Sequence, residues 1–180
     1  MSLLPNPDRP RPGAPSPLPP LSLYPVELSR NLRIESVSRL DPTPPHAVED
    51  RAPVAAAVEL MRREKVGCVL VTRAGKLVGL FTDRDLLGRV LAAGLPLSAP
   101  MAECLTPNPV TVHPKDPVQT ALKKMEKGGY RHLPVVDDQN RPVGILSVRR
   151  VMHYLVEHFP ALVYNHPPDP ARYPDAPEGA

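Results

Sequence analysis

The stretch Gly79-Leu80-Phe81-Thr82-Asp83-Arg84-Asp85 joins two patterns and decides how the surrounding chain folds. Its first half is apolar, as in a buried strand, and its second half is polar. Leucine and valine residues at helical spacing follow it, and Gly94 and Pro96 end this apolar stripe. We therefore expect a strand that ends at Thr82 and a helix that has Thr82 as its N-cap.

Thr82 and Asp85 have the spacing of a capping box, in which a hydroxyl and a carboxylate each bond a backbone N–H at the helix start. This interpretation needs no ligand. A second interpretation rests on chemistry, because a helix N-terminus attracts anions and a carboxylate beside it accepts hydrogen bonds from a ribose diol. Taken alone, the motif favours the capping box.

The composition separates a central region from two proline-rich ends. Nine of the first 25 residues are proline and six more lie in residues 160–180, whereas twelve are spread over residues 41–159. We expect both ends to be extended, with a polyproline II docking segment in residues 17–21 as the alternative to a plain disordered tail. The apolar pattern of residues 31–40 predicts a short amphipathic piece against the domain edge.

Charge and cysteine content argue against several classes of protein. The net charge is +3 with acids and bases interleaved, which does not predict a nucleic-acid surface. Cys68 and Cys104 form no CxxC pair and the six histidines lack a zinc spacing, so we expect no metal site. No apolar stretch approaches the length of a membrane span. Two cysteines suit a reducing compartment, and we expect a soluble, cytoplasmic protein without a targeting signal.

An internal duplication organises the middle of the chain. Residues 53–61 carry the pattern Pro-Val-x-x-Ala-h-x-x-Met, where h is apolar, and residues 117–125 repeat it at an offset of 64. Both copies place apolar residues at i, i+3, i+4 and i+7, which predicts amphipathic helices. One extra residue then changes the offset to 65, and Gly144-Ile145-Leu146-Ser147 repeats the junction, with Arg150 in the place of Asp85.

Each copy has the order strand, helix, strand, turn, strand, helix, with hairpin turns at residues 74–76 and 139–141. A unit of about 60 residues leaves much apolar surface uncovered, so we expect the copies to pack around a pseudo-two-fold axis. The predicted fold class is α/β (α+β), with two βαββα repeats. The predicted domains are a proline-rich, largely disordered arm (1–42), repeat 1 (43–102), repeat 2 (103–160) and a proline-rich tail (161–180).

These patterns resemble the tandem cystathionine-β-synthase (CBS) domain pair, or Bateman module, as a stand-alone bacterial-type protein. The resemblance covers residues 43–159. Each copy carries it in the Pro-Val helix, the glycine junction and a strand such as Arg131-His132-Leu133-Pro134-Val135-Val136-Asp137. In that family, nucleotides that contain adenosine, such as AMP, ADP, ATP or S-adenosylmethionine, bind in clefts between the repeats. The resemblance implies a regulatory module with such a ligand and without a required metal.

The resemblance also implies which residues bind the ligand. Asp85 would hold the ribose hydroxyls, and Thr82 a ribose or phosphate oxygen. The base would lie against apolar residues, and the phosphates against basic residues of the other repeat, where forked arginines suit phosphate oxygens. The apolar residues are Leu80, Val110 and Pro134, and the basic residues are Arg131, His132 and Arg149. Without the resemblance, Arg131 is interpreted as a surface charge and His132 as a structural histidine.

The second copy departs from the family pattern at Arg150, which cannot accept hydrogen bonds from a diol. We expect Arg150 to turn outward or to meet a phosphate. Ser147 is kept, so we predict one competent site around Asp85 and one degenerate or differently used site around Ser147. Because the second copy lacks the acid, we also hypothesise that a ligand is needed to explain Asp85.

Three functions compete for this sequence. The first is a sensor in which a bound nucleotide changes the packing of the two repeats or of a homodimer. The homodimer would form through the apolar faces of residues 86–91 and 151–155. An unidentified effector protein would then respond to the change. The second is a ligand-free interaction scaffold with a degenerate CBS pair. The third is an enzyme, but the chain shows neither a nucleophile with its base nor a paired acid and base, so we predict no catalysis.

Overall fold

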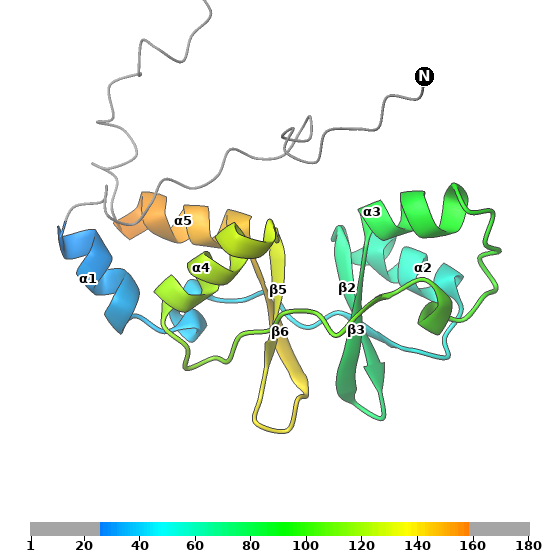
Figure 1. Ribbon diagram of the computed structural model, residues 1–180, viewed down its shortest axis with the longest axis horizontal. Coiled ribbons are helices and arrows are strands. Elements are labelled where there is room, and N and C mark those ends of the chain that lie inside the picture. The colour runs from blue at the N-terminus through cyan, green and yellow to red at the C-terminus, as the bar shows by residue number, and fades with distance from the viewer. Residues whose placement is uncertain (1–25, 159–180) are drawn as a thin grey trace, which may run out of the picture.

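The computed structural model describes residues 26–158. They form two units of strands and helices that lie beside each other (Figure 1). Each unit combines an antiparallel hairpin with flanking helices, so the predicted α/β class with two similar repeats is confirmed. Residues 1–25 of the predicted arm (1–42), with the docking segment expected in residues 17–21, and the whole predicted tail (161–180) lie outside the described residues.

Repeat 1 is built on a four-stranded sheet in the order β1-β2-β3-β4. The β1 strand runs parallel to β2, and the other neighbours are antiparallel. Apolar residues at helical spacing bury one face of α2 because Val54, Ala57 and Met61 all point into the core. The elements are β1 (Ala47–Glu49), α2 (Val54–Glu64), β2 (Cys68–Arg73), β3 (Lys76–Thr82), α3 (Asp83–Asp85), the π-helix η3 (Leu86–Leu91), the 3₁₀-helix η4 (Met101–Glu103) and β4 (Thr106–Pro107).

Repeat 2 repeats this plan with a two-stranded sheet. In place of β1, Val112 forms a parallel bridge to Val135, which lies at an offset of 64 from the pair Val48 and Val71 in repeat 1. The strand pairing therefore confirms the duplication predicted from the sequence. The elements are α1 (Val26–Ile34), the 3₁₀-helix η2 (Val37–Leu40), α4 (Val118–Gly128), β5 (His132–Val136), β6 (Pro142–Ser147) and α5 (Val148–His158).

The two repeats exchange the segments that lead into them. Residues 37–43 precede repeat 1 in the chain but pack in the core of repeat 2, and residues 101–107 precede repeat 2 but pack in the core of repeat 1. We call residues 37–43 and 101–107 the leading segments. Their equivalent contacts to the hairpins are Thr43 with Ile145 and Thr106 with Leu80. Each repeat therefore depends on the other for part of its core.

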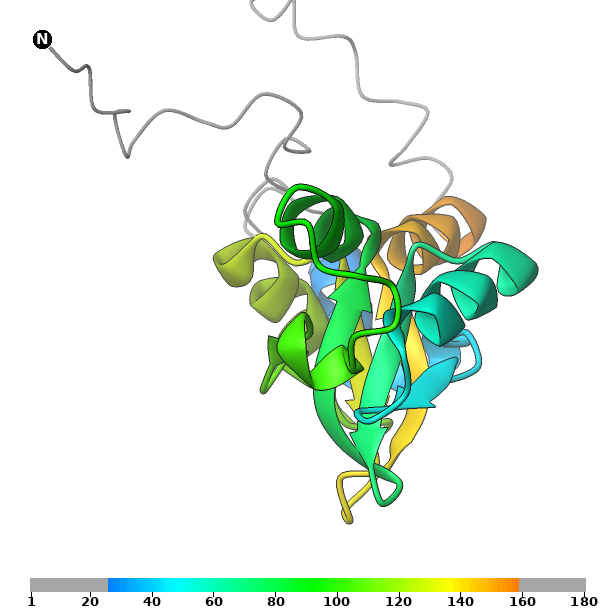
Figure 2. The ribbon, with the colours of Figure 1, turned by 90° about the vertical axis from the view of Figure 1, so that its right-hand side faces the viewer.

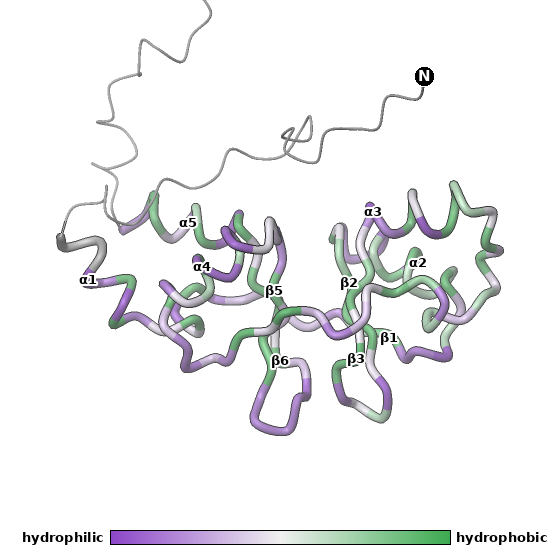
Figure 3. Tube along the Cα trace, in the orientation of Figure 1, coloured by the Kyte–Doolittle hydropathy of each residue, from purple (hydrophilic) through white to green (hydrophobic). Residues whose placement is uncertain are grey.

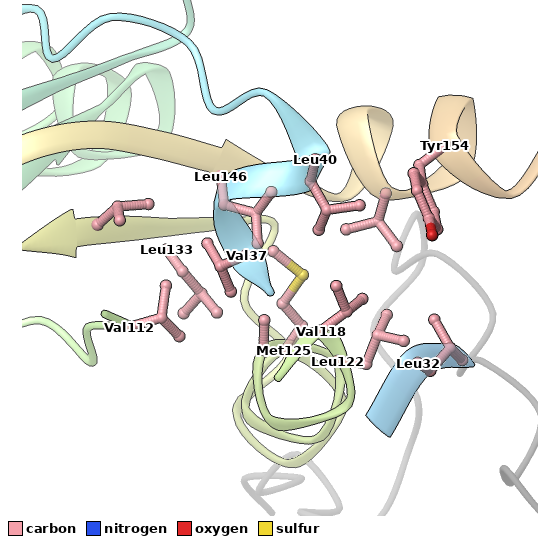
Figure 4. Close-up of a cluster of buried hydrophobic side chains, with 13 residues drawn as sticks. Leu32, Val37, Leu40, Val112, Val118, Leu122, Met125, Leu133, Leu146 and Tyr154 are labelled. Atoms are coloured by element: carbon pink, nitrogen blue, oxygen red, sulfur yellow. The ribbon is translucent and has the colours of Figure 1, made fainter. Parts of the chain in front are cut away.

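The first leading segment and α1 complete the core of repeat 2. Figure 4 shows Leu32, Val37 and Leu40 among the buried side chains of α4, β5, β6 and α5, and each of the three is at most 3% exposed. The arm predicted to be largely disordered up to residue 42 is therefore ordered from Val26 onward. Burial of three large apolar side chains offsets the entropy lost on ordering this segment. The amphipathic piece expected in residues 31–40 reaches the core, beyond the domain edge.

A third apolar cluster joins the two repeats. It consists of Cys68, Leu70, Leu77, Val136 and Ile145, with the half-buried Leu80 packed against it. Asn140 adds a polar link, because its carbonyl accepts the Leu77 N–H at 2.9 Å and its side-chain amide donates to the Leu77 carbonyl at 3.0 Å. The strands that meet here are hydrophobic, whereas the loop between β5 and β6 is hydrophilic (Figure 3).

The hairpin loops of both repeats lie together at one end of the molecule (Figure 2). The strands are antiparallel within each hairpin, and Cys68 faces Thr82 as His132 faces Ser147. Both junctions between a strand and a helix therefore lie at the opposite end, where α3 and α5 begin (Figure 1).

Gly79 and Gly144 allow the leading segments to pass close to the strands. A Cβ atom on Gly79 would lie 2.8 Å from Leu105 Cδ1 and 3.1 Å from the Thr106 carbonyl oxygen. A Cβ atom on Gly144 would lie 2.9 Å from the Cβ atom of Pro42. Such contacts are too short for packed atoms, so this crossing explains why both junctions begin with glycine.

Gly79→Ala should lower the free energy of unfolding by about 1–3 kcal/mol, because the added methyl group overpacks the crossing. Urea denaturation followed by circular dichroism measures this change. Gly88→Ala is the matched control, since a Cβ atom there meets nothing within 4 Å and alanine favours a helix by up to about 1 kcal/mol. Equal stability of the two variants would show that the crossing tolerates a side chain.

Candidate functional site

The junction between β3 and α3 contains the capping box predicted from the sequence. The Asp85 N–H donates to Thr82 Oγ1 at 3.3 Å, and the Thr82 N–H donates to Asp85 Oδ2 at 3.0 Å. The Thr82 hydroxyl donates to the same Oδ2 atom at 2.8 Å. The interpretation of this motif as a capping box is therefore confirmed. Oδ2 of Asp85 accepts hydrogen bonds that belong to the helix N-terminus.

The other carboxylate oxygen of Asp85 has two partners that sequence reasoning missed. The Thr106 hydroxyl donates to Oδ1 at 3.1 Å, and Arg89 Nε lies 3.2 Å from the same atom. A carboxylate has about four acceptor positions, and here three protein hydrogen bonds and one ion pair surround it. The hypothesis that a ligand is needed to explain Asp85 is therefore wrong.

Of the two missed partners of Asp85, one could have been predicted from the sequence and the other could not. Arg89 lies four residues after Asp85, which is the spacing of a helical ion pair and offers a usable signal. Thr106 reaches Asp85 only because β4 pairs with β3 in the exchange of leading segments. Nothing in the sequence pattern predicts that contact.

The equivalent junction of repeat 2 also has a cap, because the Arg150 N–H donates to Ser147 Oγ at 3.3 Å. The Arg150 side chain was expected to turn outward or to meet a phosphate. Its Nη1 atom lies 3.4 Å from Oδ2 of Asp41, in the first leading segment, and this carboxylate is 86% exposed, so the pair lies at the surface. Repeat 2 thus has Arg150 at the position of Asp85, and the carboxylate near this junction comes from Asp41.

The basic candidates lie at the same end of the molecule as the junctions. His132 begins β5 and faces Ser147 across the hairpin. The Arg131 carbonyl accepts the Val148 N–H at 3.0 Å, and the Arg131 side chain is exposed. Arg149 is exposed on the first turn of α5. The fold therefore gathers these three side chains beside the start of α5.

The apolar candidates lie at different depths. Leu80 is half-buried against the cluster that joins the repeats. Val110 is 37% exposed, on the connection that runs from β4 to repeat 2. Pro134 is buried within β5, and its carbonyl accepts the Val112 N–H at 3.0 Å. Of the three, Pro134 is the least accessible to a ligand.

Charges act between the two repeats at this end of the sheets. Burial lowers the pKa of His132, the Arg131 guanidinium lowers it further, and Asp83 of repeat 1 acts in the opposite direction. Burial also raises the pKa of Cys68 to about 12, with a further rise from Asp83 and Asp85. His132 is therefore a neutral imidazole and Cys68 a protonated thiol at pH 7, so Cys68 is no thiolate nucleophile.

The lowered pKa of His132 should make the fold sensitive to acid. Between the folded-state value and the ordinary value of about 6.5, the unfolded chain binds a proton that the folded chain does not. The free energy of unfolding should therefore fall as the pH drops below about 6.5. His132→Asn should remove part of this loss between pH 7.5 and 5.5 in urea denaturation, whereas His153→Asn, at an exposed position on α5, should not. An unchanged acid sensitivity in His132→Asn would contradict the assignment.

Two further searches cover only residues 26–158. Within this range, no group of three or more histidine, cysteine, aspartate or glutamate side chains is placed to hold a metal ion. No helix in the same part of the chain combines the length and the apolar character needed to cross a bilayer.

Two similar α/β repeats, joined through their sheets and by an exchange of leading segments, define a tandem-repeat module. The profile of the CBS domain matches residues 37–92 and again residues 101–157. The chain therefore belongs to the CBS domain family and contains two CBS domains, as the resemblance predicted.

Curated relatives match the middle of this chain over different shares of their own length. The meiotically up-regulated gene 70 protein of Schizosaccharomyces pombe is 39% identical over 117 residues, which are 64% of this chain and 16% of that protein. The CBS domain-containing protein YhcV of Bacillus subtilis is 34% identical over 95 residues, 53% of this chain and 67% of that protein. The chain thus spans less than a fifth of the yeast relative.

Solved structures give the same architecture. The CBS domain protein PAE2072 from Pyrobaculum aerophilum, complexed with AMP, is 29% identical with a TM-score of 0.60, and the match covers 64% of this chain and 89% of that one. The CBS domain pair of protein MJ0100, in complex with 5-methylthioadenosine and S-adenosyl-L-methionine, is 26% identical with a TM-score of 0.61. That match covers 67% of this chain and 99% of the MJ0100 chain.

Proposed function

We propose that this chain is a non-catalytic regulatory module that binds an adenosine-containing nucleotide between its two repeats, beside Asp85. The main support is the likeness, at 29% and 26% identity, to CBS domain proteins solved with AMP and with S-adenosyl-L-methionine. The ligand of this chain is AMP, ADP, ATP or S-adenosylmethionine in this proposal, and no metal is required. The cytoplasmic location expected from the cysteine content stays a prediction.

Asp85 is the proposed partner of the ribose diol, because ribose hydroxyls are donors and a carboxylate is an acceptor. Its side chain is 12% exposed, so a ligand reaches it from one side only. Thr82 would contact a ribose or phosphate oxygen through its hydroxyl. The half-buried Leu80 and the exposed Val110 offer apolar surface to the base, and the buried Pro134 contributes less than the sequence suggested.

In this proposal, side chains of repeat 2 contact the phosphates of the nucleotide. His132 is neutral at pH 7 because of its lowered pKa, so it contributes a ring nitrogen and no charge. Arg131 and Arg149 are exposed and always charged, and their planar forks suit phosphate oxygens. The second site, around Ser147, stays degenerate because Arg150 offers no acceptor and is already paired with Asp41.

The module would act on other proteins through its helices. Leu87 and Leu91 of η3 are 62% and 60% exposed, and Met152 of α5, equivalent to Leu87 at an offset of 65, is 39% exposed. Val90 and Val151, which belong to the faces expected to form a dimer, are buried in the cores instead. The proposed homodimer surface therefore narrows to the exposed side chains of Leu87 and Leu91 on η3 and of Met152 on α5.

The second candidate function is a ligand-free interaction scaffold. The contacts of the Asp85 carboxylate favour it, because three protein hydrogen bonds and one ion pair stabilise this charge without a ligand. The two candidates differ in one property, which is direct binding of a nucleotide.

Asp85→Asn should weaken nucleotide binding by about tenfold or more, because hydrogen bonds to a charged acceptor are worth roughly 1.5–3 kcal/mol. Asparagine keeps one acceptor oxygen for the cap, so the fold should persist. Isothermal titration calorimetry with AMP, ADP, ATP and S-adenosylmethionine measures the affinities. Asp138→Asn is the matched control, since it removes one charge from a hairpin loop at the opposite end of the sheets. If none of the four nucleotides binds the wild-type chain, the scaffold is the better account.

Leu87→Glu combined with Leu91→Glu should convert a dimer to a monomer in sedimentation equilibrium, because two charges enter an apolar contact. Ile34→Glu is the control. Ile34 is the most exposed large apolar residue among the described ones, at 68%, but it lies on α1. A wild-type chain that sediments as a monomer at all concentrations would exclude the homodimer.

A further inference from the structure

The two oxygens of Asp85 have different roles in the structure. Both donors to Oδ2 belong to Thr82 and form the helix cap. At Oδ1, the Thr106 hydroxyl donates a hydrogen bond and Arg89 forms an ion pair, and both residues lie outside the cap. A ligand that donates to Oδ2 would have to break the start of the helix, whereas a ligand that donates to Oδ1 has only side chains to displace.

Arg89 ties the site to another part of the chain. Its Nε atom lies 3.2 Å from Oδ1 of Asp85, and its Nη1 atom donates to the Leu105 carbonyl at 2.7 Å. The side chain is 49% exposed, so it can leave without creating a cavity. The equivalent residue in repeat 2 is Tyr154, which is buried in the core, so only repeat 1 has this bridge.

Arg89, which contacts both Asp85 and the Leu105 carbonyl, belongs to a helix of unusual geometry. The segment after Asp85 is the π-helix η3, in which the Ala92 N–H donates to the Leu87 carbonyl at 2.9 Å. Beyond η3 the helical segment ends in a Schellman cap, because Gly94 has a positive φ of 68°, its N–H donates to the Leu91 carbonyl at 3.2 Å and the Leu95 N–H donates to the Val90 carbonyl at 2.9 Å. The equivalent helix α5 is a regular α-helix. Because π-helical turns are rare and often lie at functional sites, this segment is a candidate for a change of hydrogen-bond register.

We propose that Arg89 competes with the ribose diol for Oδ1 of Asp85, and that its displacement passes the binding event to η3. This inference rests on the proposed nucleotide site. Arg89 and the exposed Leu87 and Leu91 belong to the same six-residue helix. Loss of the ion pair with Asp85 and of the hydrogen bond to Leu105 therefore removes the polar tether between this helix and the second leading segment, while the buried Val90 keeps its packing against Met101 and Cys104. A ligand at Asp85 thereby changes the exposed face of Leu87 and Leu91 without touching it.

The competition predicts the sign of a mutational effect. Arg89→Met keeps the apolar stem and removes every donor, so the nucleotide no longer has to displace an ion pair. Partly exposed ion pairs of this kind correspond to an affinity gain of about two- to fivefold. The gain should appear with AMP and equally with adenosine, which has no phosphate.

Calorimetry of the wild-type chain, Arg89→Met and Arg84→Gln with AMP and adenosine tests the competition. Arg84 is the control because it is an exposed arginine in α3, beside the same site. Tighter binding of both ligands by Arg89→Met alone is the expected result. Unchanged affinity, or weaker binding of AMP with unchanged binding of adenosine, would overturn the proposal, since the latter identifies Arg89 as a phosphate ligand.

Hydrogen exchange tests the tether independently of any nucleotide. In Arg89→Met without added ligand, the amides of Ala92 and Leu95 should exchange several-fold faster than in the wild type, while those of α5 stay unchanged. Equal exchange at Ala92 and Leu95 would overturn the transmission through η3. If neither protein binds AMP, ADP, ATP, S-adenosylmethionine or adenosine, the proposed function fails, and the exchange rates still decide whether Arg89 restrains the helix. Arg89→Lys, which keeps the charge but loses the fork, should fall between the two.

Discussion

The close crossing of each leading segment over a glycine of the other repeat is the constraint on which the structure depends. At Gly79 and Gly144 the neighbouring chain comes so near that no side chain fits. This proximity lets Val37 and Leu40 enter the core of repeat 2, and Met101 and Cys104 the core of repeat 1, each at most 3% exposed. Because each core includes residues from the other's leading segment, the two repeats form one cooperative unit and not two independent small domains.

The same crossing assembles the candidate site. By pairing with β3, the second leading segment brings the Thr106 hydroxyl and the Leu105 carbonyl to Asp85 and Arg89. The first leading segment, at the equivalent position, brings Asp41 to Arg150. The contacts of Asp85 and Arg150 therefore depend on the packing of the two repeats, since any shift of a leading segment would change the partners of these side chains. This physical link is what a regulatory module requires.

The two junctions show how one fold supports two different sites. Both keep a hydroxyl cap, because an N-terminal helix turn has orphan N–H groups in either repeat. They differ in the charged residue three positions later and in the residue at the position of Arg89, where repeat 2 has the buried Tyr154. The cap is therefore a requirement of the fold, and the arrangement of charges around it is free to differ between the repeats.

Features that depend on local spacing can be read from the amino-acid sequence alone. The capping box of Thr82 and Asp85, the helical faces of α2 and α4 and the pairing of equivalent strands follow from i, i+3 and i+4 periodicity and from the offsets of 64 and 65. The crossing of the leading segments becomes visible only in the folded chain. The helices α1 and η2 within residues 26–42 and the contacts of Asp85 with Thr106 and of Arg150 with Asp41 depend on that crossing. These pairs are 21 and 109 residues apart in the chain, and no periodic pattern records a contact made when one repeat lends its leading segment to the other.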